Sequence, residues 1–560
     1  MPFVPRNHRE YAMNPSLGYP PSNRPATMGV NGMIASAHPL ATLAGLSILR
    51  AGGNAFDAIV TTASTLNVVE PYMSGVGGIG TALVNIAAEG RVRALDFSGR
   101  APLAAEPSAF TDAAKNDGIM AAMVPGNLAG WLTMHEAYGS MELERLLGPA
   151  IGYAENGFPV THFNSKMFDA SAHLLNKFPA SAGIVLGNGG RAPAPGARLR
   201  MPQLAATLRR IATGGLDEFY RGALAREIVK GNRELGGLYT EEDLATYQPQ
   251  WLEPISINYK GYEVFTAPPN CSAFQVLQTL KLLETFDDAD RAFQQPDTLH
   301  MFMEAVKLAV TDRIKYAGDP DYVSAPLDAL LSDGYAKQQA ALIDRDTPAI
   351  VSGERYAEER PDGALKPGSP EAFDAGMTTH FAVADRDGNV VSVTQTLGGG
   401  FGSGAAVGNT GVFLNNMASY FELEEGSPNR IGPGKRVDFV VAPTQTFRDG
   451  KFHLSIGTPG SWGILQTTPQ FLTNVLDYGM TPQQAIEAPR FRYFEGRRVQ
   501  MEDRFPLHVR RALEARGHEI DLLESWSTAV GGAQGIQFDP NEGTFQGGAD
   551  PRRDGFALGY

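Results

Sequence analysis

Two runs of alternating apolar and polar residues near residue 390 constrain the fold of this chain most strongly. They are HFAVAD (380–385) and VVSVTQT (390–396), and a short turn that ends in Gly388 separates them. This pattern predicts a β-hairpin with a three-residue loop and Gly388 in the left-handed conformation. Pairing outward from the loop places Thr378 opposite Thr396. Because directly opposed side chains have Cβ atoms about 4.5–5.5 Å apart, the two hydroxyl groups should meet at the open end of the hairpin.

The segment before the hairpin is polar and shows no helix or strand pattern (Gly353–Ala375). A threonine becomes an efficient nucleophile when it is the first residue of a chain, because its own α-amine then serves as the base. The pKa of such an amine, near 7.7–8.0, suits a general base. An exposed polar segment before Thr378 would permit the cut that this chemistry needs. The alternative is that Thr378 and Thr379 only begin a strand, since threonine favours strands.

Composition and charge exclude several other classes. The chain has 560 residues, 43% of them hydrophobic, and a formal net charge of −14, with no Lys/Arg cluster of the kind that binds nucleic acid or anionic membranes. Its only cysteine, Cys271, rules out an intrachain disulfide and favours a packing role. No run of about 18 apolar residues and no signal peptide are present, which predicts a cytoplasmic protein without a membrane span. No cofactor and no metal site are expected.

The remaining segments predict a mixture of helices and strands. Two helices separated by AGGN are expected between His38 and Pro71, and most segments from Thr111 to Ile343 have helical spacing. Alternating strands dominate after Gly376, and Thr481 begins a further helix with a capping box. Because strands and helices do not alternate strictly, we expect an α+β fold built of layers.

The hairpin motif TTHFAVADRDGNVVSVTQTLGGGFGSG resembles the gamma-glutamyltransferase (gamma-glutamyltranspeptidase) family of N-terminal nucleophile hydrolases. GVFLNN, GPGKR, GTPGS, APRF and GGADPRRDGFALGY follow in the family's order, and VPGNLAGW and LDEFYRG match upstream. The resemblance implies a four-layer αββα fold, made as one chain and cut autocatalytically into two intertwined subunits. Residues 1–27 would form an N-terminal arm, 28–377 the large subunit and 378–560 the small subunit.

The resemblance also implies the catalytic residues. The cut would fall between Met377 and Thr378, and Thr378 would be nucleophile and, through its new amine, base. Thr396 matches the family's second threonine, which supports the nucleophile. Gly460 and Ser461, within GTPGS, match the pair whose backbone N–H groups face the developing negative charge. The second member of that pair is usually glycine, and a backbone donor survives the change to serine.

The positions that bind the glutamyl group in the family depart from its pattern. Tyr420 stands where an aspartate usually binds the α-amino group, Phe439 and Val440 replace a pair of serines, and Gly398 replaces an asparagine. The family has an arginine two places before position 100, and Arg100 is the nearest substitute for it. The alternative is that Arg100 only forms a surface ion pair. This pattern resembles divergent branches of the family, which include oxamate amidohydrolase-like and cephalosporin-acylase-like members.

Three hypotheses of function remain open at this point. The first is an amide hydrolase or acyltransferase acting through a threonyl ester on gamma-glutamyl-like or short carboxylate-bearing acyl amides. The second is an ordinary gamma-glutamyltransferase or glutathione hydrolase, and the third is an unprocessed, inactive binding protein. The expected partners are a small-molecule amide and the two subunits from one precursor, whose processed heterodimer could pair into a homodimer.

Overall fold

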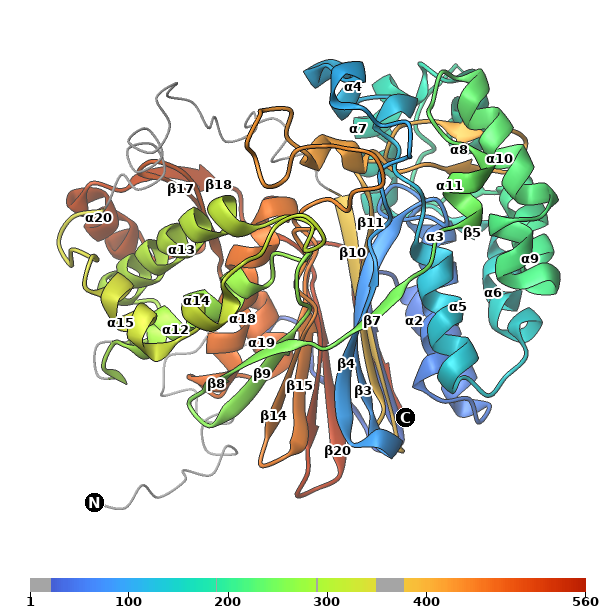
Figure 1. Cartoon of the computed structure of the whole chain (residues 1–560). Helices are drawn as coiled ribbons and strands as arrows, with labels where there is room; N and C mark the ends of the chain where they lie inside the picture. Colours follow the sequence, from blue (N-terminus) through green and yellow to red (C-terminus); the bar gives the residue numbers. More distant parts are fainter. Residues whose placement is uncertain (1–21, 188, 289–290, 349–376) are drawn as a thin grey trace.

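Two β-sheets stand face to face in the middle of the molecule, and helices cover the outer face of each sheet (Figure 1). The structure, a computed structural model, describes residues 22–187, 189–288, 291–348 and 377–560. This α+β arrangement of helix, sheet, sheet and helix layers agrees with the layered fold expected from the sequence.

Each of the two central sheets has seven strands. The first sheet has the order β1 (Thr27–Gly29), β20 (Thr544–Ala549), β19 (Gln534–Asp539), β15 (Lys451–Gly457), β14 (Thr444–Arg448), β9 (Tyr262–Thr266), β8 (Ile255–Tyr259). The second has the order β21 (Phe556–Gly559), β2 (Gly32–Ser36), β10 (Met377–Asp385), β11 (Val390–Gly398), β3 (Ile79–Ile86), β4 (Arg91–Phe97), β7 (Gln250–Leu252).

The predicted hairpin, β10 and β11, forms the centre of the second sheet. Its register is confirmed, because Val383 pairs with Val391 and Thr378 pairs with Thr396, and Gly388 in the turn has a φ of 91°. Both strands are buried on both faces, since side chains alternate between the helix layer and the first sheet. Phe381 and its alternate neighbours pack on the helix side, whereas Ala382 and Ala384 pack against strands of the first sheet.

Helices on the outer face of the second sheet come mostly from the first half of the chain (Figure 1, blue to green). The two helices expected between His38 and Pro71 are α2 (Pro39–Arg50) and α3 (Ala55–Val69), and Asn54 caps α3 in a capping box. The other helices of this half are α4 (Asp112–Asn116), α5 (Asn127–Tyr138), α6 (Leu143–Asn156), α7 (His162–Leu175), α8 (Pro179–Val185), α9 (Pro202–Tyr220), α10 (Ala223–Glu234) and α11 (Glu241–Ala245).

Helices on the outer face of the first sheet come from both halves of the chain. The predicted capping box of Thr481 and Gln484 opens α19 (Pro482–Glu487). The other helices here are α12 (Phe274–Glu284), α13 (Pro296–Tyr316), α14 (Leu327–Leu330), α15 (Asp333–Ala340), α18 (Ile464–Leu476) and α20 (Leu507–Arg516). Small sheets complete the fold: β16 (Phe491–Glu495), β17 (Arg498–Glu502) and β18 (Glu519–Leu523); β12 (Ala406–Val407) with β13 (Val412–Phe413); β5 (Phe158–Pro159) with β6 (Arg198–Leu199).

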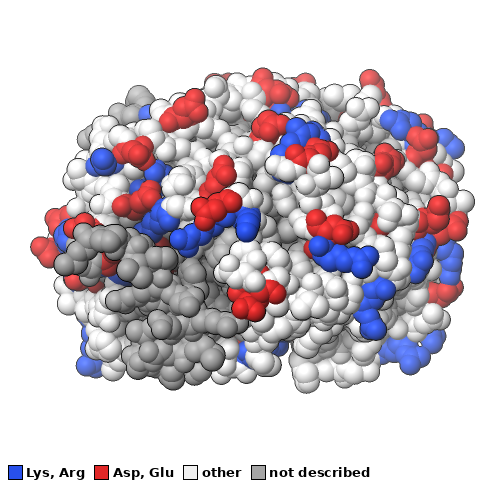
Figure 2. Space-filling view, turned by 90° about the horizontal axis from the view of Figure 1, so that it is seen from below, with Lys and Arg blue, Asp and Glu red and all other residues white. Residues whose placement is uncertain are grey.

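Two predicted segments fall largely outside the described residues, namely most of the N-terminal arm and the polar segment Gly353–Ala375. Strand β1 already includes Thr27, the last residue of the predicted arm. Within the described part of the chain, none of the helices has the length and hydropathy needed to cross a bilayer. On the face seen in Figure 2, basic and acidic side chains lie beside one another without a continuous field of either sign.

Candidate functional site

The two predicted threonines meet at the open end of the central hairpin. The Thr378 hydroxyl donates to the Thr396 hydroxyl over 3.3 Å, and both side chains are buried. Thr396 in turn donates to the carbonyl oxygen of Met377 and accepts from the Gly398 N–H at 2.8 Å. One hydroxyl therefore contacts both the predicted nucleophile and the carbonyl of the peptide bond predicted to be cut.

Alternation along β10 determines which way the Thr378 side chain points. Thr378 lies four residues before Ala382, so it shares the face that packs against the first sheet. His380 shares this face, and a Cβ placed on Gly457, the last residue of β15, would lie 2.3 Å from its ring. Burial lowers the pKa of His380 to about 3, so this imidazole is neutral at pH 7. The Thr378 hydroxyl thus lies near the junction of the two sheets.

A buried acid and a buried arginine hold the backbone and the neighbour of Thr378. Arg553 donates to the Thr378 carbonyl oxygen at 3.3 Å, and Glu70, at the end of α3, accepts from the Thr379 hydroxyl at 3.2 Å. Burial raises the pKa of Glu70 to about 8, although the positive charge of Arg553 opposes this rise. Sequence reasoning missed both residues. The only signals were the glutamate of the dipeptide EP (70–71) and the charged residues of the motif DPRRDG (550–555).

The predicted oxyanion pair lies in the loop between β15 and α18. Gly460 has a φ of 145° and Ser461 a φ of 53°, and a short 3₁₀ turn, η7 (Ser461–Gly463), leads into α18. Among the described residues, no backbone carbonyl accepts a hydrogen bond from the N–H of Gly460 or Ser461. A chain of contacts connects this loop to Thr378. The Gly532 N–H donates to Thr458, a Cβ on Gly532 would lie 2.5 Å from Arg553, and Arg553 donates to the Thr378 carbonyl.

Two of the predicted substrate-binding residues, Gly398 and Tyr420, lie on neighbouring segments: Gly398 contacts Thr396, and Tyr420 ends the turn that follows Asn416. Gly398 has a φ of 99°, and a Cβ there would fall 2.2 Å from the side-chain oxygen of Asn416. Asn416 directly precedes the 3₁₀ turn η6 (Met417–Tyr420), and the Tyr420 hydroxyl lies 2.9 Å from the Ser461 hydroxyl. The structure thus brings Tyr420 to the predicted oxyanion loop, and it gives Gly398 a backbone role beside Thr396.

Arg100, the third predicted substrate-binding residue, makes other contacts. Its guanidinium donates to the Gly434 carbonyl at 3.2 Å and lies 3.8 Å from the Asp321 carboxylate, and its side chain is 30% exposed. These contacts match the ion pair that was the alternative for this residue. Binding of a substrate carboxylate by Arg100 stays a prediction.

A buried ion pair that the sequence analysis did not single out lies near Tyr420. The Asp438 carboxylate accepts from Arg313 at 3.0 Å and from the Ser272 hydroxyl. The Arg313 guanidinium stacks 4.1 Å above the Trp462 ring, whose centroid is 5.7 Å from that of Tyr420. Burial raises the pKa of Asp438, and the adjacent arginine opposes the rise. The Trp462 ring thus contacts both the Tyr420 ring and the arginine that is paired with the Asp438 carboxylate.

Another cluster has side chains of types that bind metals. His300, Glu304 and His518 have ligand atoms within 4.8 Å of one another, and all three are buried. The Lys307 ammonium, however, lies 2.7 Å from Glu304, and the two imidazoles are already hydrogen-bonded to each other at 2.8 Å. The lysine provides the positive charge that a metal would bring, so the cluster is explained without an ion.

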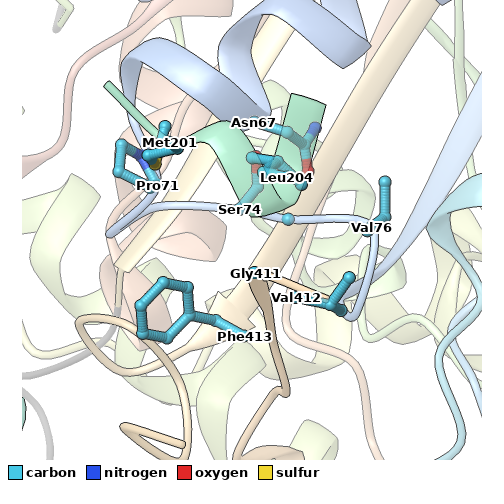
Figure 3. A pocket seen from close by; sticks show the side chains of 10 residues that line it. Asn67, Pro71, Ser74, Val76, Met201, Leu204, Gly411, Val412 and Phe413 are labelled. Atoms are coloured by element: carbon cyan, nitrogen blue, oxygen red, sulfur yellow. The ribbon is translucent and has the colours of Figure 1, made fainter. Parts of the chain in front are cut away.

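A small, largely apolar cavity lies behind β11, on the side of the helix layer (Figure 3). One of its lining residues, Ser74, accepts a hydrogen bond from Gln395 at 3.0 Å. Gln395 precedes Thr396, so its side chain points to the opposite face of the sheet. The cavity therefore does not open onto the threonine hydroxyls. Its lining residues are Asn67, Pro71, Ser74, Gly75, Val76, Met201, Leu204, Gly411, Val412 and Phe413.

Comparison with known proteins identifies the family. The family model described as Gamma-glutamyltranspeptidase matches residues 41–560. The chain belongs to this family. It is 36% identical to the Glutathione hydrolase-like YwrD proenzyme of Bacillus subtilis over 95% of the chain and 99% of that relative. It is also 36% identical to the Acylase ACY 1 proenzyme of Pseudomonas sp. strain SE83, over 95% and 94% of the two chains.

The solved structure of a cephalosporin acylase from Bacillus halodurans superposes with a TM-score of 0.87 at 35% identity, covering 97% of this chain and 98% of that one. This gamma-glutamyltranspeptidase-family chain thus has the N-terminal nucleophile hydrolase fold and is an enzyme of the family's amidohydrolase type. The predicted family and enzyme class are confirmed, and so is the layered α+β fold of N-terminal nucleophile hydrolases. Autoprocessing into two intertwined subunits stays a prediction. The individual roles of Thr378, Thr396, Gly460 and Ser461 stay predictions.

Proposed function

We propose that this chain is a proenzyme that cuts itself between Met377 and Thr378 and then hydrolyses amides through Thr378. The observation that carries the proposal is the position of the Thr396 hydroxyl, which contacts both the Thr378 hydroxyl and the Met377 carbonyl. A hydrogen bond to that carbonyl oxygen stabilises the negative charge that develops when the carbonyl carbon is attacked.

In the precursor, Thr378 Oγ attacks the Met377 carbonyl carbon while the peptide C–N bond breaks. An ester between Met377 and the threonine oxygen forms, and the Thr378 nitrogen takes up the hydroxyl proton and leaves as a free amine. Water then hydrolyses the ester, releasing the Met377 carboxylate and restoring the hydroxyl. Arg553 keeps the Thr378 carbonyl in place on the other side of the residue.

In the processed enzyme, the new α-amine accepts the Thr378 hydroxyl proton as the oxygen attacks a substrate amide. The Gly460 and Ser461 N–H groups donate to the oxyanion, and the proton passes to the leaving amine. The resulting acyl ester is then hydrolysed by water, which gives one proton through the α-amine back to Thr378 Oγ.

The acyl group favoured by this site has a terminal carboxylate and no α-ammonium. A buried ammonium needs an anion or several acceptors, whereas the Tyr420 and Ser461 hydroxyls are hydrogen-bonded to each other, and Phe439 and Val440 are apolar. The positive charge for a carboxylate end would come from Arg100, which lies 3.8 Å from Asp321 in the free protein. Glutaryl- and oxamate-like amides fit this description.

A second candidate is hydrolysis of gamma-glutamyl amides, and the buried Asp438 favours it, because this carboxylate could replace the missing aspartate. The relative named Glutathione hydrolase-like points the same way. We expect kcat/KM for a glutaryl anilide to exceed that for its gamma-glutamyl counterpart. A clear preference for the gamma-glutamyl compound would select the second candidate.

Cleavage itself is tested with the purified precursor, incubated without protease. N-terminal sequencing of the smaller fragment should read Thr-Thr-His-Phe, and Thr378→Ala should remain a single inactive chain near 60.0 kDa. Any other N-terminus removes Thr378 from its role as base. An uncut wild-type chain would favour the third hypothesis, an inactive binding protein.

A further inference from the structure

A hydrogen bond between two hydroxyl groups joins the turn that follows Asn416 to the predicted oxyanion loop. The Tyr420 hydroxyl, from η6, lies 2.9 Å from the Ser461 hydroxyl, from η7. Ser461 is one of the two residues to which the proposed function gives the oxyanion N–H groups. Any effect of the Tyr420–Ser461 hydrogen bond on catalysis therefore rests on that proposed function.

Ser461 has a backbone conformation that its side chain does not favour. Its φ of 53° lies in the left-handed region, where glycine is at ease and residues with a Cβ are strained. The residue is 2% exposed, and Gly460 before it has a φ of 145°. A serine with this strained backbone conformation persists only where contacts with the surrounding residues hold it.

Tyr420 is well anchored to give that support. The Asn416 N–H donates to the Leu397 carbonyl at 2.8 Å, and the Gly399 N–H donates to the Asn416 side chain at 2.7 Å, so η6 follows the end of β11. The Tyr420 carbonyl accepts from Asn429 at 2.7 Å. The Tyr420 ring also contacts Trp462, next to Ser461, with centroids 5.7 Å apart.

Burial raises the pKa of the Tyr420 phenol, so the hydroxyl keeps its proton throughout the range in which the enzyme would work. The hydrogen bond to Ser461 therefore does not depend on pH near neutrality. It also links the strand end that carries Thr396 to the loop that carries the oxyanion donors.

We propose that Tyr420 is a positioning residue that holds Ser461 in its left-handed conformation and thereby aims the backbone N–H groups of Gly460 and Ser461 at the acyl oxygen. Tyr420 acts through Ser461 and not by a contact with the acyl group. A glycine at position 461 would take the same φ without help. The tyrosine hydroxyl is thus needed because residue 461 is a serine and not a glycine.

The test is a double-mutant cycle with Tyr420→Phe, Ser461→Gly and the double variant, in the processed enzyme with glutaryl- and gamma-glutamyl-p-nitroanilide as probes. Tyr420→Phe should lower kcat about tenfold, equivalent to roughly 1.4 kcal/mol of barrier, with little change in KM. In the Ser461→Gly background the same substitution should have no effect on kcat. Equal effects in both backgrounds would overturn the proposal.

The same cycle is repeated in the uncut Thr378→Ala chain, with the midpoint of urea unfolding as the readout, which needs no turnover. Loss of the tyrosine hydroxyl should lower the midpoint only when residue 461 is serine. Coupling in stability without coupling in kcat would show a structural pair and overturn the positioning role. Wild-type protein that neither cuts itself nor turns over either probe would instead overturn the proposed function, and the positioning role with it.

A matched control is Tyr259→Phe in β8, at the far edge of the first sheet. This buried tyrosine hydroxyl donates to Asp477 at 2.9 Å. Its loss should lower the unfolding midpoint and leave kcat unchanged in both backgrounds. A fall in kcat as large as that of Tyr420→Phe would mean that the kinetic effect reports general loosening, which also contradicts the proposal.

Discussion

Thr396 has a hydroxyl whose hydrogen bonds are fully used: it donates to the Met377 carbonyl and accepts from Thr378 and from the Gly398 N–H. Under the proposed function, this hydroxyl would act at two stages, self-cleavage and turnover. A valine in its place has the same shape and cannot take part in these bonds.

We therefore expect Thr396→Val to slow both self-cleavage and turnover about ten- to a hundredfold, because a hydrogen bond to a charged group contributes about 1.5–3 kcal/mol. The fraction of cut chain over time, on denaturing gels, and kcat give the two rates. Thr266→Val is the control, since this buried threonine of β9 donates to the Pro443 carbonyl at 2.9 Å. Similar losses in both variants would contradict a specific role for Thr396.

Gly398 affects the site through its backbone conformation, because it has no side chain that could take part in the chemistry. A Cβ there would clash with Asn416 at 2.2 Å in a backbone with a φ of 99°. We expect Gly398→Ala to displace the N–H that donates to Thr396 and to slow self-cleavage at least tenfold. Gly90→Ala is the control, because Gly90 also has a positive φ, 62°, but its Cβ would meet nothing within 4 Å. That variant should lose about 1 kcal/mol of stability and cut normally.

At the scale of elements, the end of α3 lies against the first residues of β10, and Glu70 forms the contact. Its carboxyl has a pKa of about 8 in the folded chain against 4.5 for the group in water. Between these values the unfolded chain loses the proton and the folded chain keeps it. Stability from the protonated acid is therefore full below pH 4.5 and is lost as pH rises through about 8.

Glu70→Gln should remove this dependence. Both proteins are compared in the uncut Thr378→Ala background. Between pH 5 and pH 8.5, the free energy of unfolding of the chain with Glu70 should fall by a few kcal/mol more than that of the Glu70→Gln variant. Urea unfolding at several pH values measures the difference, and Glu514→Gln, at an exposed position of α20, is the control. Parallel pH profiles for Glu70→Gln and its parent would contradict the raised pKa.

The elements that sequence reasoning predicted well are those with local signals. A glycine turn and a two-residue alternation were enough to predict the register of the hairpin, and a capping box marked the start of α19. Glu70 and Arg553 could not be placed at Thr378 in this way, because they come from segments 309 and 175 residues away from the residues that they contact. Nor could the Tyr420–Ser461 bond, since loop positions depend on the whole packed fold.

At the scale of the whole molecule, the predicted cut divides both central sheets. In the second sheet β2 pairs with β10 and β3 pairs with β11, so each pairing joins residues before Met377 to residues after it. In the first sheet β9 pairs with β14 across the same boundary. The core between the layers is shared in the same manner.

We expect the two fragments to stay together after cleavage and to elute as one species in gel filtration, because separating them would expose the strands at the centre of each sheet. Guanidinium chloride should then resolve them into two. Fragments that separate without denaturant would contradict the shared sheets. The uncut Thr378→Ala chain should elute at the same volume as the processed complex.

The hydrogen bond from Arg553 to the Thr378 carbonyl sets a lower limit on when the precursor can reach its final geometry. The two residues are 175 positions apart. A ribosome that adds about 5–20 residues per second needs roughly 9–35 seconds to travel that distance. Throughout this interval Thr378 and Met377 have been synthesised, but the arginine that fixes the threonine does not yet exist. Because Arg553 is translated so long after Thr378, the complete geometry of the predicted cleavage site cannot form on a partly translated protein.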